Sequence, residues 1–276
     1  MTASSSTAAS LDNADGGTIG IFDSGLGGLT VVRHIAELLP RADLVYIGDR
    51  FRSPYGPRPR YEVQRFSRQI TRRLVDLGCG IIVIACNTAS AAALHELRAE
   101  FPAVDFVGME PAVKPAAHAT ESGVVGVVAT TGTLMGPLYE SVVERFGAGA
   151  AVIGEAAPDW VELVEQGITS GPEVRAAIER RLSALIDAGA DHIVLGCTHF
   201  PMLRAEIDGW LAGRAEVIDP GPAVARQTLR VAERRGATEG NGTLVLELTG
   251  STDGLGPLLD AVGLAKPTRV VVSELT

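Results

Sequence analysis

Two cysteines stand at matching places in this sequence, each directly after a run of branched aliphatic residues and one small residue. Cys86 lies in IIVIACNTAS at 81–90, and Cys197 lies in HIVLGCTHFPML at 192–203. Such runs are typical of strands buried on both faces, so each thiol is expected where a strand ends and a helix begins. Unpaired backbone amides at a helix start lower a thiol pKa and favour the thiolate. The matched pair indicates a site with two reactive thiols.

Asp23 and Ser24 occupy a similar position after TIGIF and before a glycine-rich turn. This turn lacks the GxGxxG spacing and a following lysine, and Asp23 would repel a phosphate. A plain turn with a helix cap is one interpretation. The functional alternative is a carboxylate that orients a proton or an ammonium group.

His199 follows Cys197 by two residues and has three possible roles. Because Pro201 suits the first turn of a helix, His199 could be a satisfied cap. A metal site is poorly supported, since Cys197 and His199 supply two ligands without a clear third. A polarising acid beside the thiol is favoured instead. Cys79 is interpreted as a small core residue.

The surrounding elements alternate as strand and helix, which predicts parallel sheets with helices on both faces. The run GVVGVVA at 123–129 resembles the opening TIGIF, and Thr130 stands where Asp23 stood. The fold class is therefore α/β with two similar domains and the site in the cleft between them. The expected division is a disordered extension 1–17, a first domain 18–111 plus 222–276, and a second domain 112–221. The link between the last two strands is interpreted as a glycine-rich segment.

Composition excludes several other classes of function. A net charge of −9 argues against a nucleic-acid or anionic-membrane surface. No apolar run is long enough for a membrane span, and the amino terminus does not resemble a signal peptide. The three cysteines lack a CxxC pair and do not suggest a disulfide framework, so a cytoplasmic protein is expected.

Lysine is nearly absent, which bears on the cofactor. Only Lys114 and Lys266 occur, and neither follows a strand in the way expected of a Schiff-base lysine. No pyridoxal cofactor is therefore expected. An anionic substrate would be bound by backbone amides and by hydroxyls at strand ends, those of Ser24, Thr88, Thr130 and Thr198.

Four motifs occur in order, namely DSGLGG at 23–28, PYG at 54–56, ACNTAS at 85–90 and GCTHFP at 196–201. Together they resemble the glutamate racemases of the aspartate/glutamate racemase family, and the resemblance covers most of the chain. It implies cofactor-independent interconversion of L- and D-glutamate by thiol acid–base catalysis, without a metal. It also implies a homodimer that supplies D-glutamate for peptidoglycan synthesis, and in some relatives an interaction with DNA gyrase.

The resemblance also implies roles for individual residues. The catalytic set is Cys86, Cys197, Asp23, His199 and Glu165. The substrate-binding set is Asp23, Ser24, Pro54, Tyr55, Gly56, Asn87, Thr88, Thr130, Thr198 and His199. Cys86 is expected to face the D-isomer. Ala157 stands where a cysteine is common in the family, which weakens the match around Glu165.

Two alternatives stay open at this level. One is a related racemase acting on aspartate or hydantoin, or a relative with one working cysteine that decarboxylates or isomerises its substrate. The other is a regulatory protein that keeps the fold and binds gyrase, a role that the polar amino-terminal extension could serve. The motifs at 23–28 and 54–56 favour glutamate.

Overall fold

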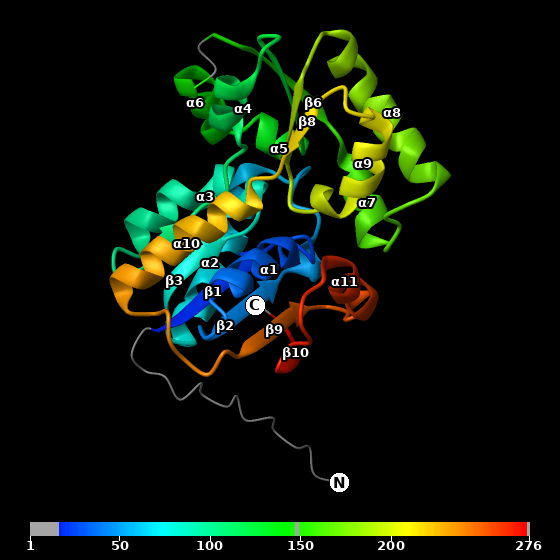
Figure 1. Ribbon diagram of the computed structural model, residues 1–276. Coiled ribbons are helices and arrows are strands. Elements are labelled where there is room, and N and C mark those ends of the chain that lie inside the picture. The colour runs from blue at the N-terminus through cyan, green and yellow to red at the C-terminus, as the bar shows by residue number, and fades with distance from the viewer. Residues whose placement is uncertain (1–16, 147–148, 275–276) are drawn as a thin grey trace.

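The computed structural model describes residues 17–146 and 149–274, and these form two parallel β-sheets flanked by helices (Figure 1). The expected α/β fold class is confirmed. The larger sheet has six strands in the order β10-β9-β2-β1-β3-β4. Its strands are β1 (Thr18–Asp23), β2 (Leu44–Gly48), β3 (Cys79–Ile84), β4 (Asp105–Val107), β9 (Leu244–Thr249) and β10 (Arg269–Ser273). The last two strands return to this sheet, as the sequence predicts.

The smaller sheet has four strands in the order β6-β5-β7-β8. They are β5 (Val124–Ala129), β6 (Ala151–Ala156), β7 (His192–Gly196) and β8 (Glu216–Ile218). In both sheets the first strand along the chain lies between the next two, and pairs with the strand that precedes a cysteine. Phe22 pairs with Ile84, and Ala129 pairs with Gly196. Residues that follow these paired strands therefore emerge together at the carboxyl edge of their sheet.

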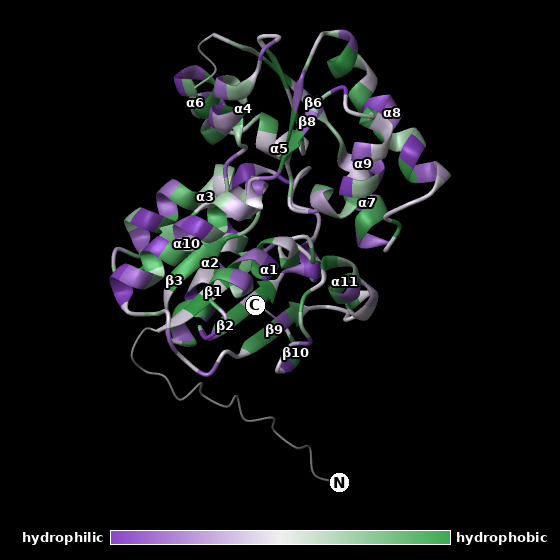
Figure 2. Cartoon of the chain, viewed as in Figure 1, coloured by the Kyte–Doolittle hydropathy of each residue, from purple (hydrophilic) through white to green (hydrophobic). Residues whose placement is uncertain are grey.

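The central strands β1, β2, β5 and β7 are almost entirely buried, whereas the edge strands β6 and β10 have no buried residue. Figure 2 shows hydrophobic residues concentrated along β1, β3 and β9. The helices that flank the larger sheet are α1 (Leu29–Leu38), α2 (Arg60–Asp76), α3 (Asn87–Glu100), α10 (Gly221–Arg235) and α11 (Leu255–Val262). Those around the smaller sheet are α4 (Val113–Ala119), α5 (Thr131–Leu134), α6 (Pro137–Phe146), α7 (Pro158–Glu165), α8 (Pro172–Asp187) and α9 (Arg204–Leu211).

One predicted element is wrong. The segment between the last two strands is interpreted from the sequence as a glycine-rich link, but it contains α11. Four of its aliphatic side chains recur at helical spacing and are buried: Leu255, Leu258, Leu259 and Val262. Left-handed glycines, Gly254 and Gly263, bound the helix at its two ends. The glycines therefore mark the two ends of a short helix and do not form an irregular link.

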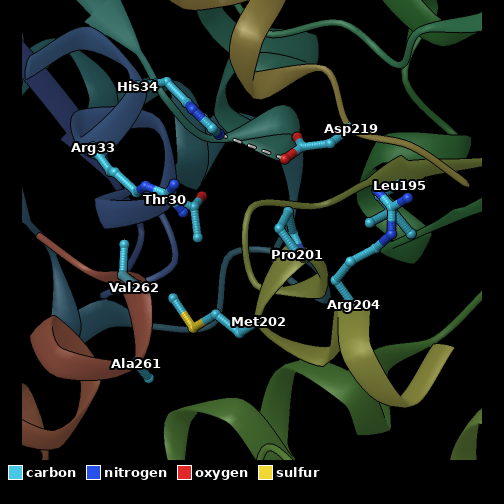
Figure 3. A pocket seen from close by; sticks show the side chains of 10 residues that line it. All are labelled: Thr30, Arg33, His34, Leu195, Pro201, Met202, Arg204, Asp219, Ala261 and Val262. Carbon is cyan, nitrogen blue, oxygen red and sulfur yellow. Dashed lines mark ion pairs between the residues drawn. The ribbon is translucent and has the colours of Figure 1, made fainter. Parts of the chain in front are cut away.

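The chain returns to the larger sheet through Asp219, directly before α10. His34 of α1 faces this carboxylate, with Nε2 3.8 Å from Oδ2, beside a pocket also lined by Met202 and Val262 (Figure 3). Asp219 Oδ1 accepts a hydrogen bond of 2.7 Å from the Gly221 amide at the start of α10. One carboxylate thus anchors the crossover to both helices.

Among residues 17–146 and 149–274, no helix is both long and apolar enough to cross a membrane. The expected extension 1–17 lies outside the described residues except for Gly17. Cys79 is the first residue of β3, and burial raises the pKa of its thiol to about 12. An un-ionised, buried thiol fits the core role expected for Cys79.

Candidate active site

Cys86 lies just past the carboxyl end of strand β3, which is buried except at Gly80, and it caps the amino terminus of α3. Its Sγ accepts a hydrogen bond from the Ala89 amide, at 3.4 Å, and lies 3.7 Å from the Ser24 hydroxyl. Ser24 follows β1, the strand paired with β3. The register of these two strands therefore places the hydroxyl beside the thiol.

The expectation that the helix start lowers the pKa of Cys86 is wrong as a net effect. Burial raises the pKa of this thiol far above its ordinary value, and the nearby Asp23 carboxylate raises it further. The hydrogen bonds from Ala89 and Ser24 lower the pKa, but they do not outweigh burial. The charge of Cys197 is another cause of the increase, so the two thiols are close enough to interact.

Cys197 follows β7, but no α-helix begins there, contrary to the sequence interpretation. A 3-10 turn, η2 (Phe200–Leu203), comes first, and α9 begins only after it. Cys197 Sγ lies 3.6 Å from Nδ1 of His199. A neighbouring imidazole, rather than a helix terminus, is the main polar contact of this thiol.

His199 lies between Cys197 and Glu165. Its Nε2 is 2.6 Å from Glu165 Oε1, and its side chain makes no capping hydrogen bond to η2. The interpretation as a helix cap is therefore wrong, and the polarising role is favoured. Burial lowers the pKa of His199, but the hydrogen bonds and charges of Cys197 and Glu165 raise it well above 6.5 in balance.

Glu165 completes this chain of side chains. It is the last residue of α7, and its Oε1 also accepts a hydrogen bond from the Leu26 amide at 3.2 Å. Burial raises the pKa of Glu165, but the hydrogen bond and charge of His199 outweigh that effect, so the net pKa is lowered. Both pKa shifts favour an ionised glutamate beside a protonated histidine. Within the described part of the chain, no group of three or more His, Cys, Asp or Glu side chains is arranged so that it could hold a metal ion.

Asp23 is fully buried at the end of β1. Its Oδ2 accepts hydrogen bonds from the Gly28 amide, at 2.8 Å, and from the Thr198 hydroxyl, at 3.4 Å. Burial raises the pKa of Asp23, whereas His199 lowers it. Asp23 Oδ1 and both side-chain polar atoms of Asn87 have no hydrogen-bond partner within the protein. Buried polar atoms of this kind are costly unless a ligand binds them.

The hydroxyls of Thr88, in α3 beside the larger sheet, and Thr130, at the start of α5 beside the smaller sheet, lie 2.8 Å apart. Thr133, which the sequence analysis missed, lies 3.0 Å from Thr130 and 3.3 Å from Thr88. It could have been found, because Thr130 and Thr133 form a capping pair at the start of α5. The cluster presents three hydroxyls where the sheets meet.

Only part of the PYG motif at 54–56 lies beside these hydroxyls. Tyr55 is buried and donates a hydrogen bond to Asp49, while Gly56 approaches Thr130 so closely that a Cβ on Gly56 would lie 3.0 Å from Thr130 Cβ. Pro54 is exposed and contributes only to the wall of a surface pocket that Glu165 also lines. Asp49 was missed by sequence analysis, although it directly follows β2, the neighbour of the strand that ends at Asp23.

The fold and the site together define a class of protein: an α/β enzyme with one thiol at an equivalent strand end of each of two sheets. Residues 19–228 match the family described as Asp/Glu/Hydantoin racemase, and the chain belongs to this family. A relative from Roseiflexus sp. (strain RS-1), "Glutamate racemase", is 44% identical over 236 residues, which cover 86% of this chain and 87% of the relative. The resemblance seen in the four motifs is confirmed, and with it the enzyme class, an amino-acid racemase.

Solved structures agree with this family over almost the whole chain. The glutamate racemase from Francisella tularensis in complex with D-glutamate is 27% identical, with a TM-score of 0.83, covering 95% of this chain and 98% of that one. The Escherichia coli glutamate racemase in complex with L-glutamate and the activator UDP-MurNAc-ala is 30% identical, with a TM-score of 0.82 and coverages of 94% and 98%. The two-sheet arrangement is therefore that of solved glutamate racemases.

Proposed function

We propose that this chain interconverts L- and D-glutamate without a cofactor, using Cys86 and Cys197 as the acid–base pair. The observation that carries the proposal is the pair of thiols, each at the carboxyl end of a strand and each with its own polar partner. Ser24 is the polar partner of Cys86, and His199 is the polar partner of Cys197. Two thiols that differ in surroundings but share one site suit removal of a proton from one face of a carbon and its return on the other.

The proposed reaction balances within the two thiols. One thiolate removes the α-proton, and the opposite thiol gives its proton to the resulting carbanion. After one turnover the two cysteines have exchanged protonation states, and the reverse reaction restores them. The resemblance assigns the D-isomer to Cys86. Because the pKa of Cys86 is raised by burial and by Asp23, binding of an ammonium group near Asp23 would favour its thiolate.

The proposed substrate contacts use groups that the protein leaves available. Asp23 Oδ1 would accept from the substrate ammonium, since this oxygen has no partner within the protein. Asn87 and the hydroxyls of Thr88, Thr130 and Thr198 would bind the carboxylates. Glutamate is preferred to aspartate or hydantoin because the solved relatives just described are glutamate complexes. Positioned donors of this kind stabilise a carbanion that water would leave unstable.

The biological setting is proposed from the resemblance and from the fold. We propose a cytoplasmic homodimer that supplies D-glutamate for peptidoglycan, with domains at 18–111 plus 222–276 and at 112–221. The membership of the two sheets supports that division. Light scattering would test the dimer. The interaction with DNA gyrase rests on the resemblance alone, and a supercoiling assay with catalytically inactive protein tests it.

The function is tested by incubating the purified protein with each glutamate enantiomer in deuterium oxide. Circular dichroism follows racemisation, and mass spectrometry follows deuterium at the α-carbon. We expect both enantiomers to racemise and the product to carry solvent deuterium, with no turnover of aspartate. Turnover of aspartate or hydantoin in preference to glutamate would replace the proposed substrate. Exchange without inversion would contradict the two-thiol reaction.

A further inference from the structure

Arg50 connects three segments that are far apart in the sequence. It begins the short 3-10 turn η1 (Arg50–Arg52) after β2, in the larger sheet. Its Nη1 donates hydrogen bonds to the backbone carbonyls of Ser251, at 2.5 Å, and Asp253, at 2.9 Å, in the loop before α11. Its Nε lies 3.9 Å from Glu165 Oε2 at the end of α7, beside the smaller sheet. In Figure 1, α7 lies on the side of the upper unit that faces α11.

The Glu165 carboxylate is held from two sides. Oε1 accepts from His199 Nε2 and from the Leu26 amide, at 2.6 and 3.2 Å, while Oε2 faces the Arg50 guanidinium. The side chains of Arg50 and Glu165 are only 15% and 20% exposed. Water and salt therefore screen this pair less than an ion pair on the open surface.

We infer that Arg50 is a positioning residue for the acid–base reaction: it keeps the Glu165 carboxylate ionised and fixed against His199, and thereby orients the imidazole beside Cys197. The inference rests on the proposed function and extends it to a residue outside the four motifs. Arg50 touches neither thiol. It acts through Glu165. Because its other hydrogen bonds are to the loop before α11, Arg50 also links the end of α7 to that loop.

The charges around Glu165 set the expected direction of change. Burial raises the pKa of Glu165, whereas His199 and Arg50 lower it. Asp23 is a nearby acid whose charge repels that of Glu165. Glu162, on the same helix as Glu165, lines the surface pocket that Arg50 and Glu165 also line. Removing the charge of Arg50 therefore raises the pKa of Glu165. At a given acidic pH, less of the carboxylate is ionised and less of the enzyme is competent.

The test compares Arg50→Gln and Arg50→Lys with the wild type, using kcat/KM for glutamate as a function of pH. We expect Arg50→Gln to lose about tenfold in kcat/KM near neutral pH. We also expect the fall in kcat/KM on the acidic side of the profile to occur at a higher pH than in the wild type. Arg50→Lys should recover most of the loss, because it keeps the charge but not the forked geometry. Arg41→Gln is the control. It removes an exposed ion pair with Glu239, whose side chains are 71% and 66% exposed, and should leave the profile unchanged.

A double-mutant cycle separates action through Glu165 from a general loss of structure. In a Glu165→Gln background, Arg50→Gln should have little further effect on kcat/KM. If the loss of kcat/KM in the double variant equalled the product of the losses in the two single variants, the inference would be overturned. A wild-type pH profile in Arg50→Gln would also overturn it.

A second readout needs no substrate. The rate at which iodoacetamide alkylates Cys197 is measured in a Cys79→Ala/Cys86→Ala background, with and without Arg50→Gln. We expect the pH dependence of alkylation to change with Arg50→Gln, because His199 adjoins this thiol. An unchanged dependence would overturn the role of Arg50. A wild type that does not racemise glutamate would instead overturn the proposed function, and the alkylation comparison still decides the role of Arg50.

Discussion

Thr88 of α3 and Thr130 at the start of α5 share a hydrogen bond of 2.8 Å that joins the two sheets where the thiols lie. Both side chains are buried. A buried hydroxyl pair at this position can exchange its mutual hydrogen bond for one to a bound carboxylate. It therefore offers a substrate contact that depends on both units of the fold.

Thr88→Val removes this hydroxyl while keeping the shape of the side chain. We expect KM for glutamate to rise about tenfold with little change in kcat, because a hydrogen bond to a charged group is worth about 1.5–3 kcal/mol. Steady-state kinetics with both enantiomers measure the effect. Thr71→Val is the matched control, since its buried hydroxyl in α2 has no hydrogen-bond partner in the protein. A Thr88→Val enzyme with wild-type KM would remove this residue from the substrate site.

Cys86→Ala and Cys197→Ala should each abolish racemisation in both directions, with losses of at least about 100-fold in kcat. In the proposed reaction each thiol is the base for one enantiomer and the acid for the other, so neither direction survives without both. Cys79→Ala is the control and should keep wild-type kcat/KM, because Cys79 lies in the core at the start of β3. Racemisation retained by either of the first two variants would contradict the two-thiol reaction.

The sequence predicts those parts of the fold and site that depend on local patterns. Apolar runs indicate β3 and β7, and the residues that follow them place Cys86 and Cys197 at strand ends. The pKa of Cys86 was not predictable, because it depends on burial and on Asp23, whereas the sequence shows only the helix start. The ion pair of Glu165 with Arg50 could not be predicted either, since it forms only when α7, beside the smaller sheet, packs near the turn after β2 of the larger sheet.

Gly27→Ala tests how closely the glycine-rich turn approaches His199 and Thr198 of the proposed active site. A Cβ on Gly27 would lie 2.5 Å from His199 Nδ1 and 2.6 Å from Thr198 Oγ1, so both groups must move. We expect a loss of about 100-fold in kcat/KM with the fold retained, because small displacements of catalytic groups are costly. Kinetics and circular dichroism measure the two effects.

Gly209→Ala in α9 is the control for that substitution, since nothing lies within 4 Å of the added Cβ. It should keep full activity and gain about 1 kcal/mol of stability from the higher helix propensity of alanine. If Gly27→Ala were as active as Gly209→Ala, the turn would not determine the position of His199.

The ion pair between Glu165 and His199 gives a stability that depends on pH. The lowered pKa of Glu165 adds stability that is present above about 4.5 and is lost as pH falls through its folded pKa. The raised pKa of His199 adds stability that is fully present below about 6.5 and is lost as pH rises through its folded pKa. The pair therefore contributes most between these two values.

Glu165→Gln removes the charge and keeps a hydrogen-bond acceptor for His199. Urea unfolding of the wild type and of this variant, measured across the pH range, gives the difference in free energy of unfolding. We expect the wild type to be more stable by the largest margin between about pH 4.5 and 6.5, with the margin shrinking on both sides. A margin independent of pH would mean that the 2.6 Å contact is a neutral hydrogen bond, and that His199 does not carry a proton beside Cys197.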